Sequence, residues 1–167
     1  MKKQQKGFSL IELLIVVAII LIIAAIAIPN LLRSRMAANE SSDVGSLRSI
    51  NTAEVTYATS YTAIGFSATL ANLGGNAATC ATAAGATTTS ACLIDDVLAT
   101  SGVNAKSGYL NTYGGVVAAG GINTQYTING DPANRGTTGQ RSFFTDQTGV
   151  IRYGLTGVAS VASSPIG

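Results

Sequence analysis

The chain has 167 residues, of which 47% are hydrophobic and only 11% are charged, and it contains two cysteines and no histidine. It has no nucleophile signature such as GxSxG, so the sequence argues against an enzyme and predicts no cofactor. The formal net charge is +2, and without Lys2, Lys3 and Lys6 seven basic and eight acidic residues remain. This near-neutral balance does not indicate a nucleic-acid-binding surface.

An apolar segment extends from Phe8 to Ile28 and contains one charged residue, Glu12. At about 1.5 Å per residue, a helix over these 21 residues extends about 31 Å, close to the roughly 30 Å hydrocarbon core of a bilayer. Three lysines and no acid precede the segment. The positive-inside bias therefore predicts a cytoplasmic N-terminus and export of the chain beyond Pro29.

A basic start followed by an apolar run is also typical of a secretory signal peptide. An ordinary signal peptide has an apolar stretch of about 7 to 15 residues followed by a small-residue cleavage site. The apolar run here is longer, and the small-residue junction on its cytoplasmic side is Gly7, which precedes the run. Cleavage at Gly7 would keep the apolar run in the mature chain as an anchor.

The segment KGFSLIELLIVVAIILIIAAIAIPNLL, which begins at Lys6, resembles the type III signal of bacterial type IV pilins and type II secretion pseudopilins. The resemblance covers residues 1 to about 35. It implies that a prepilin peptidase cleaves between Gly7 and Phe8 and that Phe8 is then N-methylated. Glu12 and Pro29 match the acidic position and the helix-interrupting proline of the family, and the short leader with Phe8 after it is similar to that of type IVa major pilins.

Glu12 needs a physical explanation of its own. A carboxylate at the centre of a spanning helix costs about 2.5 to 3.5 kcal/mol on insertion scales, and less near a helix end. Cleavage would free the amino group of Phe8, and a neighbouring subunit shifted along the helix axis would bring that cation to Glu12. Because a buried pair must be desolvated, it would fix the stagger more than add stability. The alternative is that Glu12 lies among lipid headgroups, favoured by the helix dipole.

The helix predicted from Phe8 also contains four alanines, and it is followed by Pro29. The alanines permit close helix packing in a filament core, but an ordinary membrane anchor also has such residues; they are Ala18, Ala24, Ala25 and Ala27. Pro29 lacks an amide donor and is predicted to kink or locally melt the helix where it leaves the membrane.

Residues 30–61 are predicted to form an amphipathic helix. Apolar residues recur at helical spacing on one face, at Val44, Leu47, Ile50, Tyr57 and Tyr61. The charged residues are placed on other faces; they are Arg33, Arg35, Glu40, Asp43, Arg48 and Glu54. The four that closely follow the anchor are either subunit contacts or parts of a solvated surface; they are Arg33, Arg35, Glu40 and Asp43.

Residues 62–107 are rich in small and polar residues and are predicted to form a loop region. Cys80 and Cys92 lie within it and are expected to form a disulfide in an oxidising compartment, which would contribute about 3 kcal/mol in the chain-entropy model. A metal site is not expected there, since no histidine or nearby acid completes a ligand set. Asp131 and Asp146 are weak candidates for a calcium site, and Asn39 begins a weak glycosylation sequon.

Residues 108–167 carry the strand signals, in the runs 108–112, 125–128, 141–146 and 150–153. Residues 129–132 are expected to end the second strand, and Thr148 with Gly149 to close a hairpin. The glycines at 114, 115, 120 and 121 are interpreted as a loop. An antiparallel sheet with Tyr126, Ile128, Phe143 and Ile151 on its inner face would cover the amphipathic helix. The tail beyond Gly154 is either an edge strand or disordered.

These segments predict an α+β fold in which a long N-terminal helix packs on a small antiparallel sheet. The expected divisions are a leader at 1–7, a membrane and filament-core helix at 8–29, its amphipathic continuation at 30–61, the loop region at 62–107, and the sheet with its tail at 108–167. The resemblance implies a pilus subunit that is stored in the inner membrane and polymerises into an extracellular filament. Its partners would be identical subunits, the prepilin peptidase and an assembly machine. A type II secretion pseudopilin and a non-polymerising membrane-anchored binding protein are the alternatives.

Overall fold

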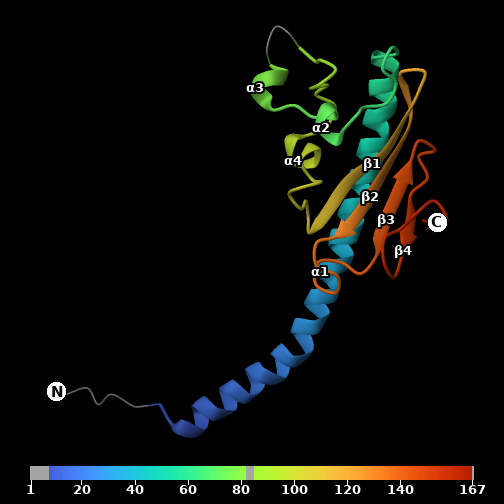
Figure 1. The fold of residues 1–167 in the computed structure, drawn as a ribbon. Coiled ribbons are helices and arrows are strands. Elements are labelled where there is room, and N and C mark those ends of the chain that lie inside the picture. Colours follow the sequence, from blue (N-terminus) through green and yellow to red (C-terminus); the bar gives the residue numbers. More distant parts are fainter. Residues whose placement is uncertain (1–7, 82–84, 167) are drawn as a thin grey trace. The chain divides into compact units, whose positions relative to one another are not determined.

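The computed structural model describes residues 8–81 and 85–166 (Figure 1). By their contacts, the residues divide into two compact units, Met1–Arg35 and Met36–Gly167. Helix α1 begins at Leu10 and ends at Ser60, so it contributes to both units. The second unit also contains three short helices and a five-stranded sheet.

Helix α1 has 51 residues and continues without a break through Pro29. Of the two effects predicted for Pro29, local melting is therefore not seen. A proline removes one hydrogen bond from the helical ladder, and the turns on either side are rich in Leu, Ile and Ala, which keep the backbone helical.

The sheet is antiparallel with the strand order β1-β2-β3-β4-β5. Its strands are β1 (Tyr109–Ala119), β2 (Ile122–Pro132), β3 (Ser142–Asp146), β4 (Arg152–Gly154) and β5 (Ser164–Pro165). In Figure 1 the strands lie along the second half of α1. The predicted α+β class, a long N-terminal helix packed on a small antiparallel sheet, is confirmed.

The hairpin of β1 and β2 is longer than predicted. Gly114 and Gly115, interpreted as loop residues, lie within β1, and Gly120 with Gly121 connects the two strands. The register shifts after Gly114, and Gly115 has a φ of +69°, which a β-bulge accommodates. Residues 129–132, expected to end the second strand, remain paired with residues 109–112 of β1. Cross-strand pairing thus overrides the local turn preference of these residues.

The other two sheet connections agree with the sequence. Gly149 has a φ of +73° in the turn between β3 and β4, as the predicted hairpin requires. Beyond Gly154, the tail returns as β5 and pairs with β4. Of the two predicted alternatives for the tail, the edge strand is therefore the one observed.

The core of the second unit lies between α1 and the sheet. Leu47, Ile50 and Tyr57 from the helix are at most 1% exposed, and Val44 and Tyr61 pack at the margin. The predicted inner-face residues of the sheet are all buried as well: Tyr126, Ile128, Phe143 and Ile151. Full burial of such side chains is worth about 1.5 to 3 kcal/mol each, so this cluster holds the sheet on the helix.

The region 62–107 contains three single-turn helices, α2 (Leu70–Leu73), α3 (Ala77–Cys80) and α4 (Asp96–Ala99). Leu70, Leu73 and Leu98 belong to the hydrophobic core, which ties this mainly irregular region to the sheet and helix. The backbone N–H of Asn111 in β1 donates to the carbonyl of Ser101. The region therefore flanks the β1 edge of the sheet.

Candidate functional site

The large apolar side chains in the first half of α1 are all exposed. From Phe8 to Leu32 the large apolar side chains are between 46% exposed, at Val17, and 83% exposed, at Phe8. By length and composition α1 is able to cross a membrane, and none of its most apolar 18-residue window is buried. A core helix of a soluble protein would be mostly covered, so the segment needs an apolar environment that the described chain does not supply.

Glu12 lies in the first turn of α1 and closes that turn. Its Oε2 accepts a hydrogen bond of 2.9 Å from the backbone N–H of Ser9, the residue directly before the helix. Ser9 and Glu12 have the spacing of a capping box, in which an acidic residue at the third helical position satisfies an otherwise unpaired amide. The SxxE pattern of a capping box is present in the sequence from Ser9 to Glu12 and is the signal that predicts this contact.

The structure places the other predicted residues of this segment as follows. Phe8 precedes the helix and is exposed, and Pro29 lies inside α1. Gly7, the predicted cleavage position, lies outside the described residues. The processing at Gly7 and Phe8 and the assembly roles of Phe8, Glu12 and Pro29 remain predictions.

Glu40 corrects the prediction that the charges of the second helix half face solvent or other subunits. Its side chain is buried and forms an ion pair of 2.7 Å with Nε of Arg141. The backbone N–H groups of Gln140 and Arg141 also donate to Glu40, over 2.8 and 3.1 Å. Burial by itself would raise the pKa of Glu40, but these donors together hold it below its usual value.

Asp43 is a second buried acid, only 1% exposed, and its prediction as a surface charge is wrong. Among the described residues, neither of its oxygens has a hydrogen bond of normal geometry. Burial raises the pKa of Asp43 to about 7, although the Asn111 amide and the Lys106 ammonium oppose the shift. The space opposite Gly130 is filled by this carboxylate, because a Cβ there would lie 2.2 Å from Asp43 Oδ2.

Glu54 is fully buried and likewise does not lie on an outer face. It accepts hydrogen bonds from the backbone and hydroxyl of Ser67, over 2.9 and 2.7 Å, and from the Tyr113 hydroxyl over 2.9 Å. Burial raises the pKa of Glu54, and these donors only partly oppose the shift. Glu40 and Glu54 thus fix α1 to distant segments of its own chain, whereas Arg33, Arg35 and Arg48 are exposed.

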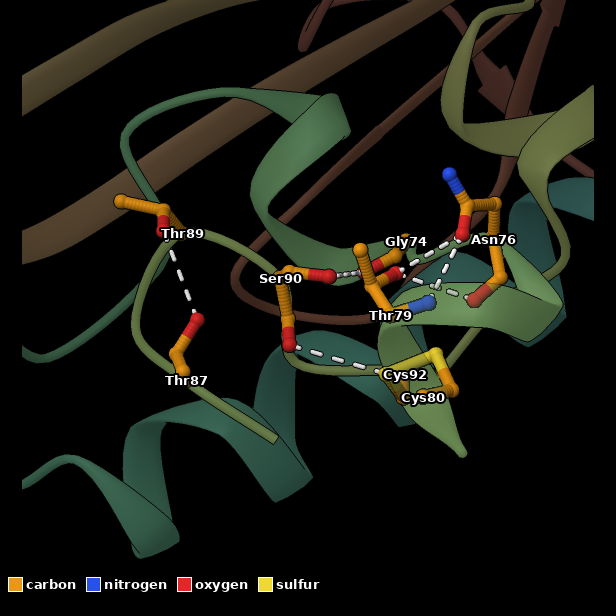
Figure 2. Close-up of a disulfide and its surroundings, with 8 residues drawn as sticks. All are labelled: Gly74, Asn76, Thr79, Cys80, Thr87, Thr89, Ser90 and Cys92. Atoms are coloured by element: carbon orange, nitrogen blue, oxygen red, sulfur yellow. Dashed lines mark hydrogen bonds between the residues drawn. A yellow bond between two sulfur atoms is a disulfide. The ribbon is translucent and has the colours of Figure 1, made fainter. Parts of the chain in front are cut away.

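Cys80 and Cys92 form the predicted disulfide, with a Cα–Cα distance of 5.9 Å (Figure 2). The bridge joins the end of α3 to the segment before α4. Gly75 packs directly against both sulfur atoms, since a Cβ there would lie 2.5 and 2.7 Å from them. The Ser90 hydroxyl, which Figure 2 also shows, donates to the Gly74 carbonyl over 3.3 Å. The disulfide therefore closes a compact corner of the 62–107 region.

Asn39, which begins the predicted glycosylation sequon, and Asp146, a candidate calcium ligand, both form hydrogen bonds within the fold. The Nδ2 of Asn39, the nitrogen that a glycan would occupy, donates to the Thr138 carbonyl over 2.8 Å. Asp146 Oδ1 accepts the backbone N–H of Thr148 over 2.9 Å. In the ranges 8–81 and 85–166, no group of three or more His, Cys, Asp or Glu residues could hold a metal ion. Their hydrogen bonds give Asn39 and Asp146 a structural role in the fold.

Comparison with known proteins identifies the N-terminal segment. The prokaryotic N-terminal methylation motif matches residues 2–28. The chain is 62% identical over 39 residues to the type IV wide pilus major component PilA4 of Thermus thermophilus, and 44% identical over 54 residues to the type IV major pilin protein PilA of Myxococcus xanthus. In its N-terminal segment, the chain is similar to type IV pilins. The similarity therefore includes the exposed first half of α1 described above.

These matches are local. They cover 23% and 32% of this chain, and 30% and 24% of the two relatives. The chain therefore matches less than a third of the length of either pilin. No solved structure matches the chain.

Proposed function

We propose that the protein is the structural subunit of a type IV pilus, which polymerises through its N-terminal helix into a surface filament. One observation carries the proposal: the helix with the methylation motif exposes a continuous apolar surface. Burial of apolar surface is worth about 25 cal/mol per Å². Packing against the helices of identical subunits would provide that burial once the subunit leaves the lipid.

Glu12 and Phe8 would fix how these helices align. Removal of the leader by a prepilin peptidase would expose the amino group of Phe8, which would then be N-methylated. Glu12 uses Oε2 for the Ser9 amide, and a carboxylate has capacity for further hydrogen bonds, so it can also accept the Phe8 amine of a neighbour. The pair would select one stagger between helices, because any other stagger leaves an unpaired charge in an apolar environment.

The same proposal gives the location and the partners. Before assembly, the subunit would lie in the inner membrane with its N-terminus in the cytoplasm; after assembly, it would be part of an extracellular filament. The peptidase, identical subunits and an assembly machine would be its partners. In this role the protein needs no catalytic residue and no cofactor, and it does not need to bind nucleic acid.

A type II secretion pseudopilin would use the same kind of helix for a periplasmic filament. Both relatives described above are pilus proteins by name, so we favour the pilus. A non-polymerising anchored binding protein is the more distant alternative, and it would keep its N-terminal residues.

The test is to measure the intact mass of the chain purified from a host that has the peptidase and to image the cells by electron microscopy. We expect a mass that begins at methylated Phe8, together with long surface fibres that contain the protein. Retention of residues 1–7 would favour the anchored binding protein. A processed chain without surface fibres would favour the pseudopilin.

A further inference from the structure

The first unit ends with two exposed arginines, Arg33 and Arg35, which both lie in α1. Within the ranges 8–81 and 85–166, no hydrogen bond or ion pair involves either guanidinium. The next acid along the chain is Glu40, and its carboxylate is already paired with Arg141. The two guanidiniums are therefore available to a partner outside the chain.

These arginines stand out in the charge pattern of the chain. From Phe8 to Asn39 they are the only charged side chains besides Glu12. They follow the apolar segment, on the side that the leader lysines direct to export. Basic residues within about 15 to 20 residues of a span oppose export of that side. Two residues that weaken the orientation signal therefore need another explanation.

The height of the arginines along the helix matches the headgroup layer of a bilayer. Ile28 ends the apolar segment, and at about 1.5 Å per residue Arg33 and Arg35 lie about 7.5 and 10.5 Å beyond it. The headgroups add roughly 5 to 7.5 Å on each side of the hydrocarbon core. Helical side chains lean toward the N-terminus, which here is back toward the membrane. Both long side chains can therefore place their guanidiniums in this layer.

The directions of the two side chains favour lipid over a single protein partner. In a helix with 3.6 residues per turn, Arg33 and Arg35 are separated by about 200° and point to nearly opposite sides of α1. One docked protein surface covers one side of a helix, whereas lipid headgroups surround it. A guanidinium binds phosphate oxygens in a bidentate manner. An anionic phospholipid offers these oxygens without an amine of its own that competes for them.

We propose that Arg33 and Arg35 bind the phosphate groups of anionic phospholipids in the leaflet on the exported side, and so hold the unassembled subunit at a fixed depth. The inference rests on the membrane-inserted state of the proposed function. Removal of the leader would take away its three lysines, so these arginines would then be the basic side chains closest to the membrane. The same contacts would have to break when the subunit leaves the lipid.

Solid-state NMR of the full chain, in bilayers of phosphatidylglycerol and phosphatidylcholine, tests the contact. The chain has six arginines, which are Arg33, Arg35, Arg48, Arg135, Arg141 and Arg152. Lipid phosphorus should dephase the Cζ signals of two of the six. The double variant Arg33→Gln, Arg35→Gln should show no dephasing. Arg48→Gln is the matched control, since Arg48 is exposed on α1 but lies about 30 Å beyond Ile28; it should keep both dephased signals.

Lipid preference provides an independent test. The association constant of spin-labelled phosphatidylglycerol relative to phosphatidylcholine should fall about fivefold for each arginine removed, because an anionic surface attracts a nearby basic side chain by that factor. High salt should lower the preference of the wild type, and Arg48→Gln should leave it unchanged. The leader lysines are present in every variant, so the differences belong to the arginines. Equal helix content by circular dichroism excludes loss of the helix as the cause.

The outcomes separate this inference from the proposed function. Wild-type arginine signals without dephasing, or an unchanged lipid preference in the double variant, would overturn the lipid contact and leave the pilus proposal intact. An equal loss in Arg48→Gln would also overturn it. Arginine signals that change with the ratio of protein to lipid would indicate binding to a second copy and would overturn it as well. A processed wild-type chain that forms no fibres would instead overturn the proposed function.

Discussion

At the scale of single residues, Glu12 combines two roles that substitution can separate. It accepts the Ser9 amide at the start of α1, and it is the only acid in the apolar segment. Glutamine fits the same capping box but carries no charge. If the charge fixes the helix stagger, Glu12→Gln and Glu12→Ala should both abolish filaments while the subunit still inserts in the membrane. Filament counts by electron microscopy and membrane fractionation measure the two effects.

A comparison of Glu12→Gln with Glu12→Ala isolates the effect of the cap on the first turn of α1, because only alanine lacks an oxygen that can accept the Ser9 amide. Loss of a capping interaction costs about 1 kcal/mol, so Glu12→Ala alone should fray the first turn. Ser9→Ala is the matched control, because it keeps both the charge of Glu12 and the backbone N–H of residue 9 that Glu12 binds, so filaments should form normally. Normal filaments with Glu12→Gln would mean that capping, and not charge, is what assembly requires.

Asp43 makes the stability of the second unit depend on pH. Its pKa is about 7 in the folded chain against a reference value of 3.8, so the folded state binds the proton more tightly than the unfolded state. The contribution of Asp43 to stability is therefore fully present below its reference pKa of 3.8 and is lost as the pH rises through 7. We expect a loss of about 3 kcal/mol between pH 5 and pH 8. Urea unfolding of the full chain in detergent at both pH values measures it.

The substitution Asp43→Asn should flatten this pH dependence, because asparagine carries no charge at either pH. The chain has no histidine, which removes the usual source of titration in this range. The residual slope would come from Glu54, whose pKa is also raised. Asp95→Asn is the matched control, since Asp95 is exposed. An unchanged slope in Asp43→Asn would contradict the assignment.

At the scale of elements, the second half of α1 buries three acids beside its apolar residues, which is unusual for a surface helix. Its acids Glu40, Asp43 and Glu54 point into the fold. Its exposed face is made mainly of small residues, with Arg48 as a charged exception; it includes Ala37, Ser41, Gly45, Thr52 and Thr56. A helix normally keeps charges outside and apolar residues inside. This face therefore allows close approach of another surface.

The helix also shows what sequence patterns predict well and poorly. The 3.6-residue period located the apolar face at Leu47, Ile50 and Tyr57, because burial of large apolar groups controls that pattern. The acids were misplaced because charge alone suggests exposure. Their partners lie far along the chain: Arg141 for Glu40, and Tyr113 for Glu54. No local pattern contains those contacts.

The disulfide should stabilise the region around α3 and α4. The two cysteines are separated by 12 residues, and closing such a loop contributes about 3 kcal/mol in the chain-entropy model. The double variant Cys80→Ser, Cys92→Ser should lower the free energy of unfolding by that amount, as measured by urea unfolding. The double change avoids a free thiol.

Substitution of Gly75 is a second test of the packing around the Cys80–Cys92 disulfide. Gly75→Ala should also destabilise it, because the added Cβ meets both sulfur atoms. Gly45→Ala is the matched control. Its Cβ meets nothing within 4 Å, and alanine in place of glycine stabilises an exposed helix by about 1 kcal/mol. Equal stability of the cysteine double variant and the wild type would show that the core alone holds the region.

At the scale of the whole molecule, assembly should depend on removal of the leader. A bulky residue at the cleavage position should hinder the peptidase, so Gly7→Val should keep residues 1–7 attached and leave the Phe8 nitrogen in a peptide bond. We expect membrane-bound, unprocessed protein and no filaments, measured by intact mass and microscopy. Gln5→Ala is the leader control and should be processed normally. Filaments built from unprocessed Gly7→Val protein would contradict the role of the freed amine.

The sequence predicted the whole arrangement better than its details. The α+β class and the hairpin at Gly149 followed from hydrophobic periods and turn residues, which act locally. The length of β1 and β2 did not, because pairing between residues 109–112 and 129–132 holds turn-forming residues in a strand. The capping box of Ser9 and Glu12 is predictable from the sequence, because its SxxE pattern is local.

The two margins of the sheet limit how copies of the protein can associate. Along β1 the Asn111 amide is already bound to Ser101, and on the other margin β5 is two residues long and includes Pro165, which has no amide hydrogen. The β5 margin therefore offers no long free row of backbone donors and acceptors for strand addition. Crowding of many copies would therefore not lead to amyloid-like fusion of their sheets through the β5 margin. A fibre held only by side-chain contacts can be taken apart and rebuilt from intact subunits.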